Sequence, residues 1–524
     1  MNSVARRIPT NPDEVPLVVA NLPTRISDIV TPWATSTPER PALIESTGTW
    51  TYGQMSAAIS ETRAQLVTLG VRPGDRVMLV CENCRAYIAL LLALGSMDAW
   101  PVLVNARLSA REVDLIREHS GARRVFYTTT VSPHAREHAK RNEAEIRELA
   151  PIGQIAVSAL HENTTPEPVE SDAAANIAAL IYTSGTTGVP KGVMLTHRNL
   201  LYVASVSAAV RQVTPEDRVF GVLPMSHAVG LSVVMMGTLL NGGTLYLAPR
   251  FDPAGVLSLC ERDGLTIIMG VPAMFALLAE YTKAKGIERL RFPKLRVISS
   301  SGAPLEASLK TTVERLFDMP LYNGYGMTEC APNIAQARPN EPRKDTAVGR
   351  PFPGMEFKFL DPNGVPVPEG RIGELRVRGP NVMRGYYKAP EETAAAIDKD
   401  GWFNTRDLAR LEDGFLFIEG RAKEMIVRFG FNVYPAELEA VFNAHPAIAR
   451  SAVIGRTVEG STGGEEVIAF VQMAADSRVT IADLMDYASE QLVPYKRPTQ
   501  IIAVPEIPLT PTGKAKKDEL AKML

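Results

Sequence analysis

Between about residues 40 and 340, short runs of β-branched residues alternate with amphipathic or apolar helical runs. The extended runs include "RVMLV", "PVLVN", "IAALIYT" and "LRVIS", and helical patterns such as "SAREVDLIREHSG" and "ASLKTTVERLFD" stand between them. This alternation is typical of β–α–β units, whose strands run parallel. With 524 residues, of which 45% are hydrophobic, the chain is long enough for several domains with large cores. The pattern therefore predicts an α/β fold with largely parallel sheets.

The pattern changes after about residue 345. The turn signals "DPNG" and "LEDG" separate short strands, and "GELRVRG" alternates apolar and polar residues, which predicts a small antiparallel sheet or β-barrel at about 345–420. From about 423 onward, strand and helix patterns form an α+β unit of roughly a hundred residues, large enough for a domain. We expect a large N-terminal domain over 1–422, with two parallel-type αβ layers plus the barrel, and a C-terminal domain over 423–524.

Composition excludes several classes of protein. The net charge of −2 gives no electrostatic case for nucleic acid, and no stretch approaches the ~18 apolar residues of a membrane span. The N-terminus lacks the apolar run of a signal peptide, and four cysteines suit a reducing compartment, so we expect a cytoplasmic protein. Cys81 and Cys84 form a C-x-x-C, but the strand and helix patterns beside them favour a buried structural pair over a redox or zinc site.

The stretch "YTSGTTGVPKG", Tyr182 to Gly192, has three glycines, five hydroxyl side chains and one lysine. It follows a predicted strand and precedes a predicted helix, an arrangement that presents backbone N–H groups and a helix N-terminus to phosphate. It is not a Walker A loop, because the G-K-[ST] ending is missing. From the residues alone, a phosphate site and a flexible surface loop both stay open. The candidate phosphate ligands are Thr183, Ser184, Gly185, Thr186, Thr187, Gly188 and Lys191.

The longer string "YTSGTTGVPKGVMLTHRNL" resembles the signature of the adenylate-forming superfamily, which includes acyl-CoA synthetases, non-ribosomal adenylation domains and firefly luciferases. Further motifs follow in the family's order along nearly the whole chain. The resemblance implies ATP, Mg2+ and coenzyme A as reaction partners. It also implies that the C-terminal domain is mobile about a hinge at Lys423 in "GRAKEMI".

The resemblance further implies a site for ATP and AMP that several motifs assemble. In "NGYGMTE", Tyr325 offers a ring to stack on adenine and Thr328 a hydroxyl to phosphate, and Glu329 is the candidate Mg2+ ligand because this cation prefers oxygen donors. "SSSGAPL" would place a turn against adenine, although a plain strand-end turn is the alternative. The remaining nucleotide-binding candidates of these two motifs are Gly302, Ala303, Pro304, Asn323, Gly324, Gly326 and Met327.

Two later motifs would complete this site. Asp407 in "GWFNTRDL" would accept both ribose hydroxyls, and Arg421 would contact ribose or phosphate. Arg406 stands where the family usually has glycine, which puts the local backbone approach in doubt, and we expect its side chain in solvent.

Lys514 in "PLTPTGKAKK" matches the catalytic lysine of the family, whereas composition alone would assign it to a solvated basic tail. Rotation of the C-terminal domain would bring Lys514 to the site for adenylation, then withdraw it and open a coenzyme A channel beside Gly430 and Phe431. Acetylation of Lys514 would remove its charge and inactivate the enzyme.

The resemblance also bears on the acid. His227 in "LPMSHAVGL" would lie beside the substrate carboxylate, with a helix-capping role as the alternative, and the stripe His227, Gly230, Val234 and Gly237 would line the acyl pocket. Ala228 replaces the aspartate of amino-acid-activating relatives, which disfavours an amino acid. No cation lies along the stripe, which disfavours a dicarboxylate. A fatty or aromatic monocarboxylic acid remains.

Coenzyme A is the expected acceptor, because the chain stops ten residues after Lys514 without a carrier domain. The alternatives are an acyl-AMP ligase that loads a carrier protein in trans, luciferase-like oxidation, and a non-catalytic nucleotide or acyl-adenylate sensor. The presence of Thr328, Glu329 and Lys514 together argues against the sensor. The oligomeric state, a homodimer included, stays open.

Overall fold

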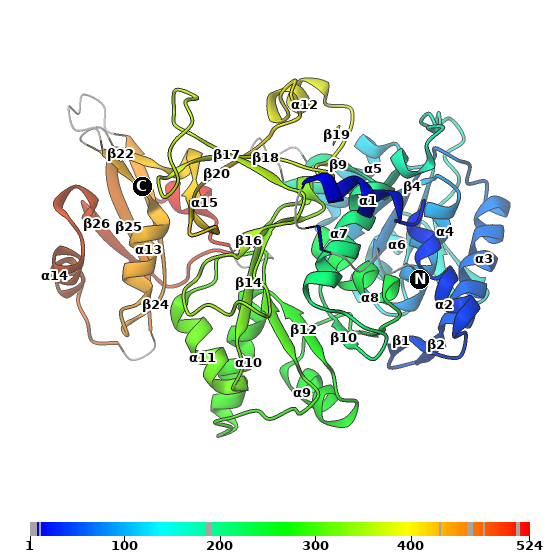
Figure 1. The fold of residues 1–524 in the computed structure, drawn as a ribbon, viewed down its shortest axis with the longest axis horizontal. Coiled ribbons are helices and arrows are strands. Elements are labelled where there is room, and N and C mark those ends of the chain that lie inside the picture. The colour runs from blue at the N-terminus through cyan, green and yellow to red at the C-terminus, as the bar shows by residue number, and fades with distance from the viewer. Residues whose placement is uncertain are drawn as a thin grey trace.

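The computed structural model describes residues 8–9, 12–184, 190–428, 431–457, 465–474, 477–509 and 514–524. Two large sheets, a small antiparallel sheet and a separate C-terminal unit make up the described chain (Figure 1). Within these residues, every helix is too short or too polar to cross a membrane.

The first large sheet has eight strands in the order β19-β9-β8-β4-β3-β5-β7-β6. The pairs β3–β4, β3–β5 and β4–β8 are parallel, as the alternating pattern predicts, and the outer pairs are antiparallel. The strands are β3 Arg76–Cys81, β4 Trp100–Asn105, β5 Arg124–Tyr127, β6 Glu145–Leu149, β7 Gly153–Val157, β8 Ile177–Ser184, β9 Pro190–Thr196 and β19 Gly385–Tyr386.

The second large sheet has nine strands in the order β16-β15-β14-β13-β12-β10-β11-β1-β2. Its six central strands, from β14 to β1, are parallel. The strands are β1 Pro41–Glu45, β2 Gly48–Thr51, β10 Arg218–Gly221, β11 Thr244–Leu247, β12 Ile267–Gly270, β13 Val297–Ser300, β14 Leu321–Gly326, β15 Asn333–Gln336 and β16 Arg350–Pro351.

Three layers of helices enclose these two sheets. The helices α4 and α7 and the π-helix η5 share one core with both sheets, so they form the middle layer. The helices α5 and α6 cover the other face of the first sheet, and α9, α10 and α11 cover the other face of the second. Strands buried on both faces need apolar residues throughout, and all six residues of β3 are buried. The chain therefore has the two αβ layers that the sequence predicts.

Several helices of this large part begin at the capping signals of the sequence; for example, Thr196 accepts a hydrogen bond from Asn199 N at the start of α7. Their bounds are α1 Val15–Ala20, α2 Thr31–Ser36, α3 Tyr52–Thr68, α4 Arg85–Ser96, α5 Ala110–Ser120, α6 Pro133–Arg141, α7 His197–Val210, η5 Val229–Met236, α8 Gly237–Leu240, α9 Pro253–Arg262, α10 Pro272–Ala284, α11 Ala307–Phe317 and α12 Pro390–Ala396. The 3-10 helices are η2 Pro12–Glu14, η3 Ile26–Ile29, η4 Ala173–Ala175 and η6 Thr328–Cys330.

The segment after residue 345 forms an antiparallel sheet of four strands in the order β17-β18-β20-β21. Its strands are β17 Glu356–Leu360, β18 Gly373–Arg378, β20 Phe403–Glu412 and β21 Phe415–Arg421. No pairing of the outer strands β17 and β21 closes this sheet in the described residues, so the antiparallel sheet is observed and a closed barrel is not confirmed.

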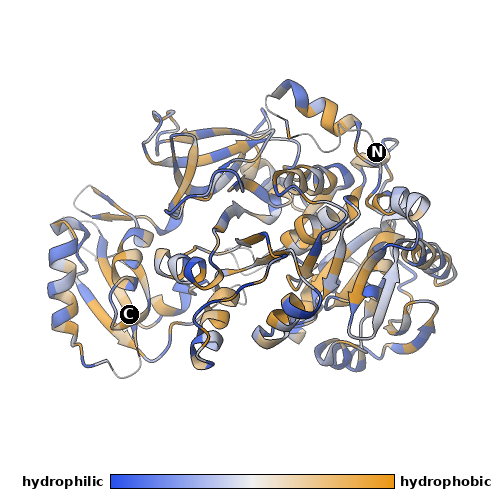
Figure 2. Ribbon diagram, turned by 60° about the horizontal axis from the view of Figure 1, so that its bottom comes forward, coloured by the Kyte–Doolittle hydropathy of each residue, from blue (hydrophilic) through white to orange (hydrophobic). Residues whose placement is uncertain are grey.

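The C-terminal unit has its own core. The helices α13 and α14 cover one face of the sheet β24-β25-β26, and α15 covers the other. The buried residues of these two clusters all lie between 426 and 520. Figure 1 shows this unit at one side of the molecule, and Figure 2 shows its strands as mostly hydrophobic. The separate core agrees with a boundary near 423, which stays a prediction. The elements are η7 Ala422–Glu424, β22 Ile426–Arg428, β23 Phe431–Val433, α13 Pro435–Asn443, β24 Ile448–Thr457, β25 Glu465–Met473, α14 Ile481–Gln491, η8 Pro494–Lys496, β26 Gln500–Val504 and α15 Lys517–Ala521.

Candidate active site

The described ends of the glycine-rich stretch belong to two paired strands. Strands β8 and β9 pair antiparallel up to Ser184 and Pro190, and Thr183 lies opposite Lys191. The helix α7 begins only at His197, after β9, so the expected helix N-terminus does not follow the loop directly. Any phosphate contact of this loop must therefore come from the hairpin itself. The candidates Gly185, Thr186, Thr187 and Gly188 lie outside the described residues, as does the side chain of Ser184.

Lys191 and Glu329 approach the same aromatic ring. The Tyr386 hydroxyl donates a hydrogen bond to Glu329 Oε1 at 2.9 Å, and Lys191 Nζ lies 5.3 Å from the centre of the Tyr386 ring. Strand β19 holds Tyr386 beside β9, which carries Lys191. The fold thus brings together two residues that the sequence places 138 positions apart, from Lys191 to Glu329.

The Glu329 carboxylate suits a divalent cation. Burial raises the pKa of this carboxyl, while the hydrogen bond from Tyr386 and the charge of Arg421 lower it. Mg2+ is commonly held by one or two carboxylates together with substrate phosphates, and no cluster of three metal-binding side chains is found in the described part of the chain. A single hard oxygen donor beside a nucleotide fits that arrangement.

Asp407 is the centre of a second charged group. Its carboxylate accepts a hydrogen bond from the Tyr325 hydroxyl and lies 3.4 Å from Arg421 Nε. Strands β20 and β21 pair Asp407 with Arg421, and β14 supplies Tyr325. Burial raises the pKa of Asp407, against the effects of Tyr325, Arg421 and Lys514. Residues from three predicted motifs therefore meet here.

Lys514 lies near this charged group, and its charge interacts with those of Arg421, Asp407 and Glu424. The side chain is exposed, yet the protein around it lowers the pKa of its ammonium, and the positive charge of Arg421 lowers the pKa further. Thr510 to Gly513 of the motif lie outside the described residues.

Arg406 keeps the backbone conformation of the glycine that it replaces. Its φ is +59°, in the left-handed region, and its N–H donates to Asn404 Oδ1 at 2.8 Å. A residue other than glycine pays about 1–2 kcal/mol for this conformation. The side chain is exposed, as expected. The substitution therefore leaves the turn before Asp407 in place.

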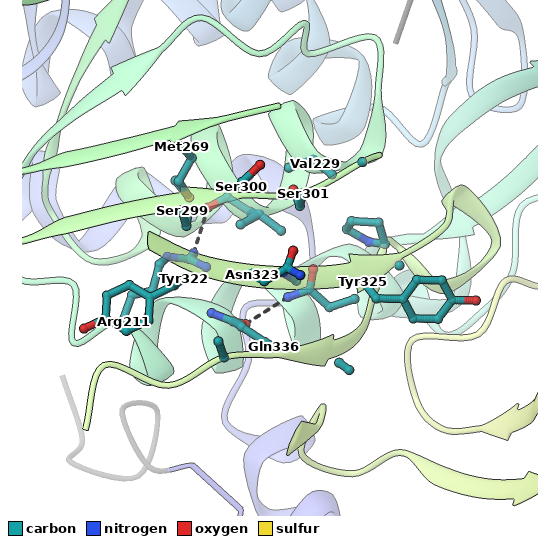
Figure 3. A pocket seen from close by; sticks show the side chains of 18 of the residues that line it. Arg211, Val229, Met269, Ser299, Ser300, Ser301, Tyr322, Asn323, Tyr325 and Gln336 are labelled. Carbon is teal, nitrogen blue, oxygen red and sulfur yellow. Dashed lines mark hydrogen bonds between the residues drawn. The ribbon is translucent and has the colours of Figure 1, made fainter. Parts of the chain in front are cut away.

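A cavity lies beside β13 and β14, and we call it the β14 cavity. Asn323, Gly324, Tyr325 and Gly326 line it along β14, and Gly302 lines it after β13 with a φ of +86° that favours glycine. Figure 3 shows Tyr325 at one end of the cavity. Ala303 and Pro304 follow in the loop after β13, and Met327 and Thr328 follow β14. The two nucleotide motifs thus border one cavity.

The helix that was expected to line an acyl pocket presents residues other than the predicted stripe to the β14 cavity. Residues Val229–Met236 form a π-helix, so the spacing of 3.6 residues per turn does not hold there. Val229 and Val233 line the β14 cavity, whereas His227, Gly230, Val234 and Gly237 do not. Gly230 instead lies against the Pro224 carbonyl, where a Cβ would come within 2.2 Å. The His227 side chain is exposed, and surrounding protein lowers the pKa of its imidazole.

A cation outside the predicted stripe also lines this cavity. Arg211 follows α7 directly, and its side chain reaches the β14 cavity next to Val233. A dicarboxylate was disfavoured because no cation lies along the stripe, and Arg211 lies outside that stripe.

Lys423 lies in η7, between β21 and β22. Lys517 joins this segment to the C-terminal unit, because its ammonium lies 2.8 Å from both Glu424 and Glu439. Phe431 is 54% exposed and stacks on Tyr495, while Gly430 lies outside the described residues.

Two family models cover most of the chain. That of the AMP-binding enzyme matches residues 30–387, and that of the AMP-binding enzyme C-terminal domain matches residues 437–514. The chain belongs to the AMP-binding enzyme family. The resemblance to adenylate-forming enzymes is thereby confirmed.

Relatives of this AMP-binding enzyme include a feruloyl-CoA synthase from Amycolatopsis sp., 35% identical over 90% of this chain and 93% of the relative. The 4-coumarate–CoA ligase 5 of Oryza sativa subsp. japonica is 34% identical over 93% of this chain and 92% of the relative. Among solved structures, o-succinylbenzoate coenzyme A synthetase (MenE) from Bacillus subtilis, in complex with ATP and magnesium ion, has a TM-score of 0.79 at 29% identity, over 94% of this chain and 99% of that chain.

Sequence reasoning missed two residues of this AMP-binding enzyme that the fold brings to the site. Tyr386 stands in "RGYYK", which carries no recognisable chemistry, and only the pairing of β19 with β9 places it over Lys191. Arg211 stands at the end of a helical pattern in which nothing indicates a functional residue. The C-x-x-C prediction was right: Cys81 and Cys84 are buried and free, and burial raises the pKa of both thiols.

Proposed function

We propose that this enzyme activates an aromatic carboxylic acid as its acyl-adenylate and transfers the acyl group to coenzyme A. At the level of reaction class the chain is an AMP-forming acid–CoA ligase, which follows from its family and from similarity to CoA ligases over about nine-tenths of its length. The choice of an aromatic acid is finer, and two of the relatives act on feruloyl and 4-coumarate groups. A fatty acid is the other candidate.

The observation that carries the proposal is the grouping of Glu329 and Lys514 near Asp407, whose carboxylate accepts a hydrogen bond from Tyr325 at one end of the β14 cavity. A carboxylate is a poor acyl donor because its leaving group would be oxide. Attack of the acid carboxylate on the α-phosphate of ATP releases pyrophosphate and gives an acyl group with AMP as its leaving group. Negative charge grows on phosphate oxygens in this step, and cations fixed in position stabilise it.

Each charged residue has a proposed part. Lys514 would stabilise the α-phosphate charge, and Lys191 would contact the outer phosphates from β9. Thr328 would donate to phosphate, and Asp407 would accept the ribose hydroxyls with Arg421 beside it. His227, neutral at pH 7 because surrounding protein lowers its pKa, would lie beside the acid carboxylate.

Mg2+ would be held by the Glu329 carboxylate, which Tyr386 orients through its hydrogen bond. When bound, the cation neutralises phosphate charge and favours departure of pyrophosphate. Gly302, Ala303 and Pro304 would border the adenine, with the Tyr325 ring against it.

For thioester formation, the second half-reaction, Lys514 must leave the active site. We propose that the C-terminal unit turns about Lys423, so that the face with Gly430 and Phe431 replaces Lys514 and admits the thiol. The ion pairs of Arg421 with Asp407 and of Lys517 with Glu424 lie on either side of Lys423. A short segment held at both ends is suited to act as a pivot.

A panel of acids tests the proposal. Cinnamates, benzoates and fatty acids are each incubated with ATP, Mg2+ and coenzyme A, and AMP and thioester are measured by mass spectrometry. We expect AMP and aryl-CoA in equal amounts from an aromatic acid, loss of both in Glu329→Gln, and little change in Glu356→Gln, a surface carboxylate paired with Arg378. Acyl-adenylate without thioester would favour a carrier protein as acceptor, and no turnover of any acid would favour a sensor.

A further inference from the structure

The β14 cavity contains a buried guanidinium without an acidic partner. Arg211 is 5% exposed and lines the cavity, yet no carboxylate forms an ion pair with it in the described part of the chain. Its contacts are Ser207 Oγ at 3.2 Å and the Val233 carbonyl at 3.3 Å, both from Nη2. Its Nε is buried and has no hydrogen-bond partner. Buried charges in proteins are normally paired, so this one needs an explanation.

Asp217, the acid next to Arg211 in the Arg296 hydrogen-bond network, already has a partner. Asp217 receives two hydrogen bonds from Arg296, from Nε at 2.9 Å and from Nη2 at 2.6 Å. Arg296 also donates from Nη1 to the Arg211 carbonyl at 2.8 Å, which fixes the backbone of Arg211. Burial, with the charge of Arg296 as a second cause, lowers the pKa of Arg211 to about 9. Arg211 therefore stays cationic at pH 7 while the backbone beneath it is held rigidly.

The position of Arg211 sets its distance from the proposed nucleotide end of the cavity. Figure 3 shows Arg211 beside Tyr322 at one end of the cavity and Tyr325 at the other. Tyr322 and Tyr325 are three residues apart on β14, which spans about 10 Å at the rise of a strand. Tyr325 and Gly302 belong to the proposed nucleotide end, where the acid carboxylate must react. Arg211 thus lies at the end of the cavity that is remote from the reaction.

We propose that Arg211 binds an oxygen acceptor at the far end of the substrate acid, about one cinnamate length from the reacting carboxyl. This inference rests on the proposed function. The shared chemistry is an oxygen that accepts from a guanidinium, and a second carboxylate or a phenolic oxygen in the para position would supply it. The apolar residues Val229, Val233 and Met269 would contact the ring between the two ends.

The test compares four cinnamic acids that differ only at the para position: 4-carboxycinnamic, 4-hydroxycinnamic, 4-methylcinnamic and unsubstituted cinnamic acid. The quantity measured is kcat/KM for thioester formation. We expect wild-type enzyme to prefer an oxygen-bearing acid over 4-methylcinnamic acid by about 10- to 100-fold, the usual range for a hydrogen bond to a charged group. A preference for the carboxylate or for the phenol identifies the source of the acceptor, and either supports the inference.

Variants separate recognition from a structural role. In Arg211→Met the ratio of oxygen-bearing to methyl acid should fall toward one, while Arg211→Lys should keep part of it. Arg198→Met, at the other end of α7, should leave the ratio as in wild type. Equal loss for all acids in Arg211→Met would mean a structural role and overturn the inference. If that variant fails to fold, the wild-type enzyme alone still tests the inference. Equal turnover of the methyl and oxygen-bearing acids by wild-type enzyme would overturn the inference.

The failure of this inference differs from failure of the proposed function. No thioester from any acid would refute the function itself. Thioester formation without preference at the para position would leave the function intact and remove only the role of Arg211.

Discussion

The Lys517 ion pairs should determine how firmly the C-terminal unit is held at the proposed hinge. Lys517 Nζ lies 2.8 Å from Glu424 in η7 and 2.8 Å from Glu439 on α13. Glu439 also accepts a hydrogen bond from Val453 N of β24 at 2.8 Å, so it is fixed in the sheet. Replacing Lys517 by Met removes the ammonium and keeps most of the side-chain length.

The magnitude follows from distance and exposure. At 2.8 Å and an effective dielectric constant of 20, each pair contributes about 6 kcal/mol of Coulomb energy before desolvation is subtracted. Breaking a fully buried pair costs about 3–5 kcal/mol. The Lys517 side chain is 18% exposed and the two glutamates 29% and 21%, so we expect a smaller loss of about 2–3 kcal/mol.

The assay is urea unfolding, followed by hydrogen exchange of peptides from α13 and β24. Lys516→Met is the matched control, because Lys516 is 41% exposed and pairs only with Glu519 on its own helix, so it should cost less than about 0.5 kcal/mol.

The pH dependence has a definite sign. The pKa of Lys517 is raised by Glu439 and Glu424 against desolvation. Its stabilisation is therefore fully present below the unfolded pKa near 10.4 and is lost as pH rises through the folded pKa. Wild type and Lys517→Met should differ by a constant amount at pH well below the unfolded pKa and converge as the pH rises through the folded pKa. Equal losses in the two variants, or a difference that grows above pH 10.5, would refute the reasoning.

Three other changes test separate parts of the site. Lys514→Ala should abolish adenylation and spare thioester formation from pre-made acyl-adenylate, as should acetylation of Lys514; equal loss of both half-reactions would contradict rotation of the C-terminal unit. Arg406→Gly should relieve the left-handed backbone at φ +59° and raise stability by about 0.5–1 kcal/mol in urea unfolding, and a loss of stability would show that the turn is unstrained. Gly326→Ala would place a Cβ 2.1 Å from the Pro332 carbonyl and should cost about 2–3 kcal/mol and weaken ATP binding, whereas Gly324→Ala, with its nearest atom at 3.6 Å, should be tolerated; similar melting temperatures for the two would refute this.

The sequence predicted the layers of the fold better than it predicted which residues of a given helix or strand face the site. The alternating pattern was sufficient for the parallel sheets, because a strand such as β3 is buried on both faces and reads as a continuous apolar run. The four-strand sheet was predicted only as a sheet or barrel, since closure depends on pairing between strands distant in sequence. The helix after the glycine-rich loop begins at His197, as the sequence predicts, but the sequence did not predict that β9 intervenes and pairs back onto β8.

The acyl-pocket stripe stays a prediction, but it does not coincide with the residues that line the β14 cavity, for a local reason. A spacing of three and four residues selects one face of an α-helix, and the same spacing selects different residues once the segment becomes a π-helix. Nothing in "VGLSVVMM" indicates that change, because all eight residues are apolar or small. Arg211 was missed for a different reason: it lies 18 residues before Val229 and meets it only through packing of α7 on η5.

Three charged residues of the candidate site share one property that relates them to the nucleotide. Burial disfavours the charged form of Glu329 and of Asp407, and it also disfavours the charged form of Lys514. Each group therefore gains from a ligand atom that stabilises its charge: a cation for Glu329, hydroxyl donors for Asp407, and phosphate oxygens for Lys514. ATP with its magnesium ion carries all three on one molecule, with the ribose between the base and the phosphates. Residues whose charged forms the surrounding protein disfavours are thus matched together by a single substrate, which is why their arrangement, rather than any one of them, argues for adenylation.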